Sequence, residues 1–568
     1  MNEKIKGLLS QAIVNEDVRN MLIGQIKATI GKLKSDEAKA AFMQAAVNPE
    51  ARAGLVQQLM ADPIMAPIVE KMTSNETKAA LAAQFKRKYK GNPMDQWVDF
   101  KYWMKHWKAV IAQPKDKADK AKMSEAMLKY PWMFDLMKNV HMVKAMNEGR
   151  TGSALKMSWI MNIENTKVIS NMLQDVILDP ENTIMAHIML PTEIYQAMGL
   201  KYYWPEVPSS LLAMLDQNSP AVYMDYIQNC GLPEDTCTYT SQTPGVVLAG
   251  HCPSTDTCMV CCNLACESGA ASYALIEEYF GLPTYRIEIP YDFKTAEGRQ
   301  RVVEDLKGMI AFLEEHTDHT MDWDKLREIL ERENQATEIE TEHFEMQRTE
   351  FPPIPGDVLW QTHMIFVNGI PGTEQSLNLF KQLNKLGRKA YALKEPAVKN
   401  MKYRAILWNP PAFGYQHFWT WLEKCWGVGV VNDMETFLHL PLIDTSTPET
   451  MLEGLAEHYS NAPMSRNNRG PAENWLGDLN LMTSMYKPDF ILDLNQMACR
   501  SSLALNGVLK EWGKEKNVPI CFVDYSLYDM RVVSRQGVRD QINSFMLNVM
   551  KATPRDESLL VFDDSETW

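Results

Sequence analysis

From about residue 180 onward, short runs of apolar and β-branched residues alternate with amphipathic segments of helical period. The runs predict strands at 245–250, 284–290, 358–369, 404–409, 428–432, 490–495 and 519–525. The segments between several of them predict helices at 269–279, 375–386, 415–425 and 501–515. Strands that alternate with helices form parallel sheets covered on both faces. The pattern therefore predicts an α/β fold with doubly wound parallel sheets.

The first 165 residues differ from the rest of the chain, because they show helical periodicity and almost no strand signal. The segment 51–60, for example, repeats apolar residues at spacings of three and four. A second boundary falls at 349–357, where three prolines and a glycine follow a long charged helix predicted at 323–345. We therefore predict a helical N-terminal region at 1–165, a first α/β domain at 166–350 and a second at 351–568.

Charge and hydropathy argue against several classes of partner. The 568 residues carry a net charge of −14, whereas binding to a phosphate backbone relies on dense patches of Lys and Arg. No apolar run approaches the roughly 20 residues that a membrane-spanning helix needs. The N-terminus also lacks the apolar core of an export signal. We therefore expect a cytoplasmic protein that binds neither nucleic acid nor membrane.

The ten cysteines are spread very unevenly, since seven of them lie between residues 230 and 266. These seven are Cys230, Cys237, Cys252, Cys258, Cys261, Cys262 and Cys266. A reducing compartment disfavours a disulfide framework, so metal binding, catalysis or packing must explain the distribution. The spacing of Cys258 and Cys261 fits one half of a zinc knuckle, but no second pair at such a spacing follows downstream to complete a tetrahedral site.

Two cysteines stand where the sequence predicts the start of a helix. Cys499 follows the strand at 490–495 and precedes a helix that begins near Ser501, and Cys266 precedes the helix at 269–279. Ligands of open parallel sheets collect at the carboxyl ends of strands. The positive end of the helix dipole also favours the thiolate that a metal or a nucleophilic reaction requires. The alternative for both residues is a cysteine that only packs.

Cys237 is the third candidate ligand, because it lies in the polar segment 235–245, which shows no apolar period that would require burial. Thiolates from two α/β domains can meet in the cleft between them, and cysteine thiolates are the usual protein ligands of iron–sulfur clusters. Cys425 and Cys521 lie in apolar segments and are predicted to pack in the core. His251 either donates a hydrogen bond to one of the metal ligands or is an ordinary loop histidine.

Motifs of several other enzyme classes are missing from the sequence. There is no GxxxxGK[ST] phosphate loop and no GxSxG nucleophile elbow. The glycines at 369–372 and 427–429 lack the dinucleotide fingerprint. We therefore expect neither ATP binding through a phosphate loop nor hydrolysis of the GxSxG type.

Several loose motifs follow one another in a family-specific order. In the first half they are LPTEIYQAMG at 190–199, CTYTS at 237–241, CESG at 266–269 and YRIEIP at 285–290. In the second half they are RAILWNPP at 404–411 and the run from Cys499 through VPICFVDYS at 518–526 to Phe545. This succession resembles the 2-hydroxyacyl-CoA dehydratase and benzoyl-CoA reductase family. The similarity lies in the order of the motifs rather than in any single one.

Members of this family have two flavodoxin-like α/β domains per subunit and hold a 4Fe–4S cluster with three cysteines. The resemblance implies that Cys237, Cys266 and Cys499 are these cluster ligands. With three ligands instead of four, one iron stays open to a substrate oxygen or a small ligand. The resemblance also implies a heterodimer with a related sister subunit, and a separate iron–sulfur activator that hydrolyses ATP and injects single electrons.

The substrate that the resemblance implies is an acyl-CoA thioester, which one-electron reduction converts into a ketyl radical anion. In the dehydratases, which are lyases, the ketyl expels the 2-hydroxyl group and the 3-position then loses a proton. In the reductases the acceptor is an aromatic thioester instead. The expected protein is an anaerobic, oxygen-sensitive enzyme subunit whose acyl group the sequence does not identify.

The sequence departs from the family pattern in three places. The helical region before about residue 165 has no counterpart in shorter members, so it is a candidate docking element for a partner. Gln541 replaces the usual arginine before Phe545, with Arg539 nearby, which alters that end of the site. The extra cysteines favour an alternative, a double-cubane protein whose 8Fe–9S cluster reduces small molecules. The additional ligands would come from Cys230, Cys252, Cys258, Cys261 and Cys262.

A non-catalytic subunit, or a scaffold stabilised by zinc, is the third hypothesis. Catalytic acids and bases stay unassigned by the sequence. Glu193 and Ser268 lie in the matching motifs, but helix capping or solvation explains either residue equally well.

Overall fold

The computed structural model describes residues 116–130, 145–215, 219–264, 266–437, 440–469 and 471–561, together with single residues between 98 and 143. The chain divides into two compact units, Met1–Gln96 and Trp97–Trp568, and every described residue belongs to the second. Most of the helical region predicted at 1–165 therefore lies outside the described residues. Its described part includes α8 (Lys117–Lys129) and the beginning of α10 (Gly152–Leu178), which are helices as predicted.

The first of two parallel sheets consists of four short strands. They are β1 (Thr183–Ala186), β2 (Lys201–Tyr203), β3 (Met259–Cys262) and β4 (Thr284–Ile287), in the spatial order β2-β1-β3-β4. Every neighbouring pair is parallel, and Met185 lies opposite Tyr203 on one side and Met259 on the other. β1 and β3 are buried along their entire length, because other elements cover both faces of the sheet.

The second sheet repeats this topology. Its strands are β5 (Tyr403–Trp408), β6 (Val428–Asp433), β7 (Phe490–Gln496) and β8 (Ile520–Tyr525), all parallel, in the order β6-β5-β7-β8. If strands are numbered within each half, both sheets have the order 2-1-3-4, which is that of the first four strands of a flavodoxin-like sheet. In each sheet the order reverses between the first and third strands. Folds of this kind bind ligands at that point.

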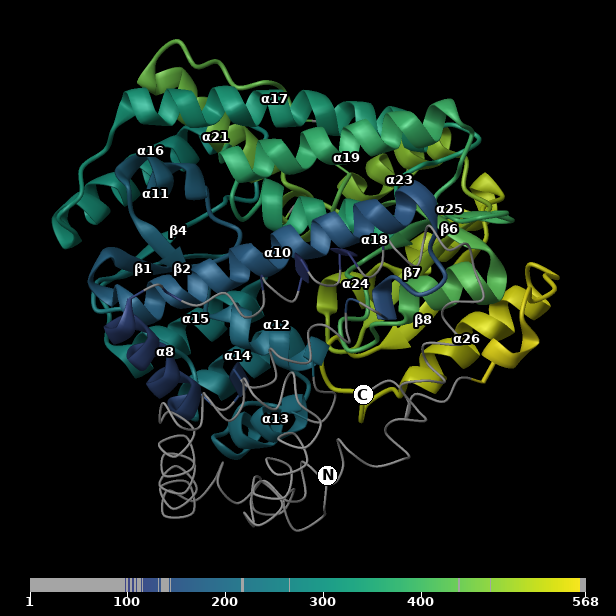
Figure 1. Ribbon diagram of the computed structural model, residues 1–568, viewed down its shortest axis with the longest axis horizontal. Coiled ribbons are helices and arrows are strands. Elements are labelled where there is room, and N and C mark those ends of the chain that lie inside the picture. Colours follow the sequence, from purple (N-terminus) through teal and green to yellow (C-terminus); the bar gives the residue numbers. More distant parts are fainter. Residues whose placement is uncertain are drawn as a thin grey trace, which may run out of the picture. The chain divides into compact units, whose positions relative to one another are not determined.

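Helices make up most of the remaining structure (Figure 1). In the first half they are η2 (Pro180–Asn182), α11 (Thr192–Met198), α12 (Glu206–Leu215), α13 (Ser219–Asn229), α14 (Thr238–Leu248), α15 (Glu267–Phe280), α16 (Ala296–His316) and α17 (Trp323–Gln347). In the second half they are α18 (Gly356–Thr362), η3 (His363–Val367), α19 (Glu374–Ala392), α20 (Phe418–Trp421), η4 (Leu422–Trp426), α21 (Pro448–Asn461), α22 (Pro463–Arg469), α23 (Glu473–Tyr486), α24 (Arg500–Ala504), α25 (Asn506–Lys516), α26 (Arg535–Asn548) and η5 (Glu557–Leu559). None of the described helices is both long and apolar enough to cross a bilayer.

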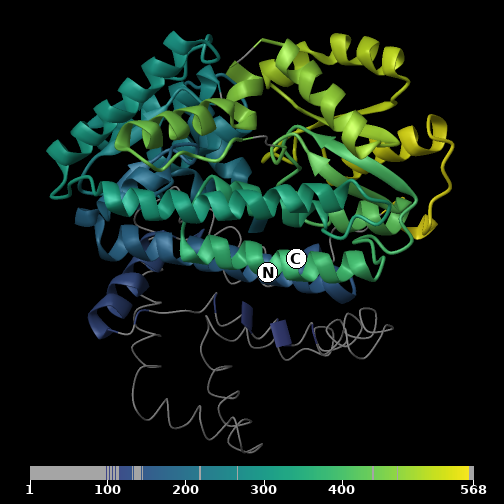
Figure 2. The same ribbon diagram turned by 90° about the horizontal axis from the view of Figure 1, so that it is seen from above.

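Three helices pack across the two halves. α10 contacts β2 of the first sheet and also α18 and α19 of the second half, and α17 contacts both α11 and α19 (Figures 1 and 2). In the opposite direction, α21 packs against α16 and adds Leu452 and Leu455 to the hydrophobic core of the first sheet. The two α/β halves therefore share core side chains, although each has its own sheet.

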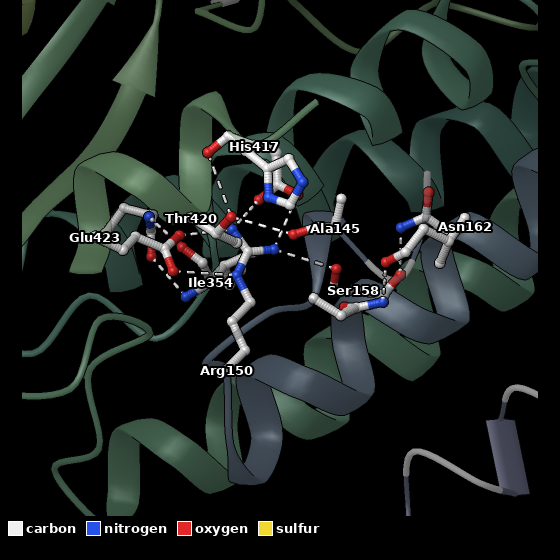
Figure 3. A network of polar contacts seen from close by, with 12 residues as sticks. Ala145, Arg150, Ser158, Asn162, Ile354, His417, Thr420 and Glu423 are labelled. Atoms are coloured by element: carbon white, nitrogen blue, oxygen red, sulfur yellow. Dashed lines mark hydrogen bonds and ion pairs between the residues drawn. The ribbon is translucent and has the colours of Figure 1, made fainter. Parts of the chain in front are cut away.

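A buried ion network holds the start of α10 against the second half (Figure 3). The Arg150 guanidinium donates to both carboxylate oxygens of Asp357, at 2.9 and 2.7 Å, and to those of Glu423, at 3.2 and 2.6 Å. It also donates to the Ser158 hydroxyl on α10 itself. Burial alone would lower the pKa of Arg150, but the two carboxylates raise it above its ordinary value, so the guanidinium stays charged.

The predicted strands of the second half from 404 onward coincide with β5 to β8, and the strand at 284–290 coincides with β4. Two predicted strands are wrong. Residues 245–248 end helix α14, and most of 358–369 forms α18 and the π-helix η3. Short apolar runs of this kind do not distinguish a buried strand from a buried helix. Gly245 has no side chain, which allows α14 to pack closely against α13. A Cβ at this position would lie only 2.5 Å from the carbonyl oxygen of Tyr223.

The strands β1, β2 and β3 were not predicted, because each contains only three or four residues and its pattern is too short to recognise. β3 lies inside the cysteine-rich segment, which sequence reasoning treated as a possible metal motif. All four predicted helices are confirmed. The predictions at 269–279 and 375–386 coincide with α15 and α19, that at 415–425 with α20 and η4 together, and that at 501–515 with α24 and α25 together. The domain ranges 166–350 and 351–568 stay predictions, each of which contains one complete sheet.

Candidate active site

The switch points of the two sheets meet at one central pocket. His187 directly follows β1 and Asn409 directly follows β5, while Cys266 and Cys499 lie in the connections that follow β3 and β7. All four residues line one cavity of about 210 Å³. This cavity lies where the rule for open parallel sheets expects ligands, with a contribution from each half of the molecule.

The structure brings the three predicted ligands together, since Cys237, Cys266 and Cys499 all line the central pocket. Each is the N-cap residue of a helix, of α14, α15 and α24 respectively. All three are free thiols of intermediate exposure. The predicted position of Cys266 and Cys499 before a helix is confirmed, whereas Cys237 precedes helix α14 and not the strand that we predicted.

Polar contacts join the Cys237 segment to the loops of the second sheet. The Thr238 hydroxyl lies 3.3 Å from the Gln496 side-chain nitrogen and 3.2 Å from the Ser526 hydroxyl. Gln496 ends β7, three residues before Cys499, and its side-chain oxygen accepts from the backbone N–H of Leu527. This short network fixes the first-half cysteine beside the second-half cysteine.

The protein environment disfavours the charged form of two of these thiols. Burial and the neighbouring Cys499 raise the pKa of Cys237 to about 12, against the opposing effect of backbone N–H groups in the first turn of α14. Burial likewise raises the pKa of Cys266, again against N–H groups at the start of its helix. A positively charged centre among the three sulfurs would reverse this balance, because thiolates are the metal-binding form.

The residues that could hold an iron–sulfur cluster are the three cysteines of the central pocket. Among the described residues, no group of three or more His, Cys, Asp or Glu side chains has an arrangement that could hold one metal ion. A cubane cluster differs from a single ion because each thiolate binds a different iron, so its ligands stand farther apart. Three cysteines at three helix N-termini around one cavity are chemically suitable ligands for such a cluster.

The remaining cysteines of the cysteine-rich segment lie elsewhere. Cys252, Cys258, Cys261 and Cys262 are buried in the core of the first sheet, and Cys230 is exposed just after α13. None of these five lines the central pocket. Cys425 and Cys521 are buried in the core of the second sheet, as predicted.

Glu206, the first residue of α12, is a buried carboxyl on the wall of the central pocket. Its Oε1 accepts a 2.5 Å hydrogen bond from the Tyr273 hydroxyl, and its Oε2 has no partner among the described residues. Burial raises the pKa of Glu206 to about 7, against the effect of the Tyr273 hydrogen bond. The carboxyl can therefore both take up and release a proton near neutral pH.

Glu435, just after β6, is a second such carboxyl on the same wall. Its Oε2 accepts from the indole N–H of Trp360 at 2.5 Å. Burial raises the pKa of Glu435 to about 8, and the negative charge of Asp433 adds to this effect. At pH 7 Glu435 is therefore mainly protonated.

His187 completes the set of ionisable groups from the first switch point. Its Nδ1 accepts from the backbone N–H of Met189 at 3.0 Å, which leaves the proton of the neutral ring on Nε2. That nitrogen faces Glu206 Oε1 at 3.8 Å. Burial lowers the pKa of His187 to about 3, so the ring is neutral and can orient a polar group without adding charge.

Apolar side chains form most of the remaining wall. They include Ile169, Met189, Trp204, Val207, Leu211, Met214, Trp360, Met364, Phe413, Met434, Met464 and Leu527. Methionine side chains adapt to irregular shapes, and a dry wall strengthens the electrostatic effect of the few polar groups. The pocket therefore fits an apolar group that carries one polar reacting centre.

Sequence reasoning missed Glu206 and Glu435. A signal for Glu206 was present, since it follows the short strand β2 and begins a helix, but that strand had not been recognised.

Of the residues that the motifs suggested, Glu193 lines a neighbouring cavity and Ser268 bonds to the Thr240 hydroxyl at 2.5 Å. The Gln541 side chain bonds to the backbone of Asp524 on β8, away from the pocket, and the His251 ring bonds to the Tyr223 hydroxyl.

Comparison with protein families gives a match that spans both sheets. The family described as 2-hydroxyglutaryl-CoA dehydratase, D-component, matches residues 187–547, from His187 at the first switch point to the end of α26.

The chain belongs to the 2-hydroxyglutaryl-CoA dehydratase D-component family.

This match confirms the resemblance that the order of motifs indicated. It covers Cys237, Cys266, Cys499, Glu206 and Glu435, and it leaves residues 1–186 outside the family region. Membership makes the protein a component of a dehydratase of the 2-hydroxyacyl-CoA type. A comparison with individually curated proteins gives no match.

Proposed function

We propose that this protein is the iron–sulfur subunit of a radical 2-hydroxyacyl-CoA dehydratase, a lyase that removes water from the acyl group of a CoA thioester. The observation that carries the proposal is the convergence of three thiols from both halves on one apolar pocket that also contains two carboxyls with raised pKa values. Family membership supports the reaction class. A related sister subunit and an ATP-hydrolysing iron–sulfur activator are the partners that we propose.

Cys237, Cys266 and Cys499 would hold a 4Fe–4S cluster. When bound, the cluster would supply single-electron transfer to the thioester carbonyl. The contribution of the protein is to hold the three sulfurs at helix N-termini, where oriented backbone N–H groups favour their charged form. The wall of apolar side chains would keep water away from the thioester.

Proton transfer is assigned to the two carboxyls. Glu435, mainly protonated at pH 7, would give its proton to the departing 2-hydroxyl group, which then leaves as water. Glu206, with a pKa near 7, would accept the proton that leaves the 3-carbon of the substrate. The neutral His187 ring, whose Nε2 lies 3.8 Å from Glu206 Oε1, would pack beside this carboxyl and limit its movement. One proton is donated and one is accepted in each turnover, so the two transfers balance.

An aromatic acyl-CoA reductase subunit is the second candidate, and the rings of Trp204, Trp360 and Phe413 on the pocket wall favour it. The two candidates differ in their products, because a reductase consumes two electrons for each double bond that it removes. Incubation with an aromatic and a 2-hydroxyacyl thioester, followed by mass spectrometry, separates a product two hydrogens heavier from one that has lost water.

The placement of Cys252, Cys258, Cys261 and Cys262 in the core, away from the central pocket, supports one 4Fe–4S cluster over a double cubane. Oxygen-free purification should give about four irons and as many sulfides per chain, against about eight irons for an 8Fe–9S cluster. Zinc without sulfide would indicate the scaffold hypothesis and overturn the proposal.

Serine substitution tests the ligands one at a time. We expect Cys237→Ser, Cys266→Ser and Cys499→Ser each to deplete cluster iron, because serine is a poor substitute for a thiolate ligand. Cys425→Ser is the matched control, since this cysteine is buried in the second core and away from the pocket. Full iron content in all three variants would contradict the assignment.

A further inference from the structure

The charges on the wall of the central pocket limit which acyl groups it can hold. No Lys or Arg is found among the described residues that line this pocket. The histidine of the wall, His187, is neutral, because burial lowers its pKa to about 3. A carboxylate that leaves water needs a cation or a full set of hydrogen bonds in exchange. The described wall therefore offers no charged partner to an anionic acyl group.

Two arginines lie near wall residues in the sequence, but neither belongs to the wall. Arg466 lies on α22 two residues after Met464 of the wall, and its guanidinium donates to the Asp478 carboxylate of α23 at 2.5 Å. Arg500 directly follows Cys499 and is exposed on α24. Solvent ions screen the charge of an exposed side chain. Neither arginine therefore supplies a buried counter-charge.

Apart from His187, the ionisable groups of the described wall are acids. Glu206 and Glu435 line the pocket together with the three cysteines. Each proton that these groups release leaves a negative charge in the pocket. Apolar walls screen charges less than water does, so these charges would repel an entering carboxylate.

Uncharged donors on the wall do not change this balance. The Trp204 indole Nε1 and the Gln361 amide Nε2 belong to residues of the wall and have no hydrogen-bond partner in the described part of the chain. Every 2-hydroxyacyl thioester has two oxygens, the carbonyl and the 2-hydroxyl, that such donors can bond. Two neutral donors would satisfy these oxygens and leave none for a terminal carboxylate.

Helix α12 presents an apolar face to the pocket. Val207, Leu211 and Met214 line the pocket over about 10 Å of helix, at 1.5 Å per residue. Leu211 is 5% exposed. An alkyl chain against this face exchanges water for apolar contact, which is favourable in proportion to the area buried. The face therefore suits an aliphatic or aromatic side chain.

We propose that the substrate is a 2-hydroxyacyl thioester with an uncharged, apolar side chain, and that the pocket discriminates against the terminal carboxylate of a 2-hydroxyglutaryl group. The family description names 2-hydroxyglutaryl-CoA, so this chain differs from that name in its acyl group. The identity of the substrate as a 2-hydroxyacyl thioester rests on the proposed function. The preference among acyl groups rests on the charges of the wall.

The first test measures binding without turnover. Three saturated thioesters that have no 2-hydroxyl to lose are compared by calorimetry with the cluster-loaded protein and no activator. They are glutaryl-CoA, its terminal carboxamide and 5-methylhexanoyl-CoA, whose carboxylate, carboxamide and isopropyl ends have similar shapes. The CoA part is common to all three.

We expect 5-methylhexanoyl-CoA to bind about 100-fold or more tightly than glutaryl-CoA, because a buried unpaired charge is strongly unfavourable. The carboxamide should lie between them. Equal affinities for glutaryl-CoA and 5-methylhexanoyl-CoA would overturn the inference. A carboxamide that binds as weakly as the carboxylate would show that polarity sets the preference, and would overturn the argument from charge.

The second test adds a cation to the wall. Met214 is partly buried at the end of the apolar face, and lysine has a side chain of similar length. Met214→Lys should raise the affinity for glutaryl-CoA relative to 5-methylhexanoyl-CoA by about tenfold, through attraction across a poorly screened pocket. Met214→Gln is the matched control, since it is polar and uncharged. Equal affinity ratios in the two variants, both folded by thermal unfolding, would overturn the role of charge.

The third test separates the inference from the proposed function. With the activator supplied, 2-hydroxy-5-methylhexanoyl-CoA should be dehydrated with a kcat/KM about 100-fold or more above that of 2-hydroxyglutaryl-CoA. A kcat/KM for 2-hydroxyglutaryl-CoA that is equal or higher would overturn the inference and leave the proposed function standing. A protein that binds 5-methylhexanoyl-CoA in preference but dehydrates neither thioester would overturn the proposed function and leave the preference of the pocket standing.

Discussion

Glu206 and Glu435 illustrate, at the scale of the residue, how environment changes the chemistry of one functional group. Glu435 accepts a hydrogen bond from the indole N–H of Trp360, and Glu206 accepts one from the Tyr273 hydroxyl. Burial raises the pKa values of these two carboxyls to about 8 and about 7. An exposed carboxyl in water ordinarily has a pKa of about 4 and is ionised at neutral pH. Burial thus provides a proton donor and a proton acceptor within one pocket.

The first prediction concerns the role of Glu206 as a base. Glu206→Gln keeps the shape and a hydrogen-bond acceptor for Tyr273 but cannot take up a proton. We expect kcat to fall by about 100-fold or more, since a positioned acid or base contributes typically 10²–10⁴-fold. Steady-state kinetics with the loaded enzyme measures this effect, with iron content as the control. Unchanged kcat at normal iron content would remove Glu206 from the mechanism.

The second prediction concerns the pH dependence of stability. The pKa of Glu206 is about 7 in the folded chain and near 4.5 when unfolded, so the folded state binds the extra proton between these values. The contribution of Glu206 to the free energy of unfolding therefore falls as pH rises from 4.5 to 7, and this contribution is absent above pH 7. At about 1.4 kcal/mol per unit, the contribution of this group is about 3 kcal/mol. Thermal unfolding across this range should show a smaller decrease for Glu206→Gln than for wild type.

At the scale of the element, a buried charged side chain, that of Arg150, fixes the position of the N-terminal end of α10. Arg150 is 5% exposed, and its guanidinium binds Asp357 at the start of α18 and Glu423 in η4. A buried ion pair adds little net stability compared with apolar packing, but the loss of one partner leaves the other charge buried and unpaired. The network therefore makes the position of α10 specific.

The third prediction follows from this network. Arg150→Met leaves Asp357 and Glu423 without their cation and should reduce stability by about 3–5 kcal/mol. Arg348→Met is the matched control, because the ion pair of Arg348 with Glu345 is solvent-exposed and should contribute only about 0–1 kcal/mol. Denaturant unfolding of both variants measures the difference. Equal stabilities would mean that α10 is held by its apolar contacts alone.

At the scale of the whole molecule, the central pocket depends on both sheets and on the helices that pack across them. α21 belongs to the second half by sequence, yet Leu452 and Leu455 are buried in the core of the first sheet. α10 and α17 pack against elements of both halves in the same way. The two sheets therefore have little freedom to separate, and the three cysteines keep a common pocket.

The fourth prediction tests this sharing of cores. Leu455→Ala removes a side chain that is 1% exposed and should cost about 2–5 kcal/mol, because a cavity remains in the first core. Leu481→Ala, at a position that is 42% exposed on α23, should change stability by less than about 0.5 kcal/mol. Calorimetry should show the 97–568 unit melting in one transition that moves as a whole. Two transitions, with only the first-half one shifted, would contradict the shared core.

The sequence by itself determined the α/β class, the strands of the second sheet, the order of family motifs and the three candidate thiols. These features are local, since a buried strand of six or seven residues or a cysteine before a helix is visible within a short window. Apolar runs such as 245–250 and 358–369 gave the wrong secondary structure, because buried helices and buried strands have the same local composition.

Only the tertiary structure decided which cysteines share a cavity and which are core residues. Cys261 and Cys266 are five residues apart, yet one is buried in β3 and the other lines the central pocket. The structure also decided which of the 72 acidic residues have raised pKa values, among them Glu206 and Glu435. The elements that bury a carboxyl lie far apart in the chain, so the local sequence around Glu206 or Glu435 does not show that its pKa is raised.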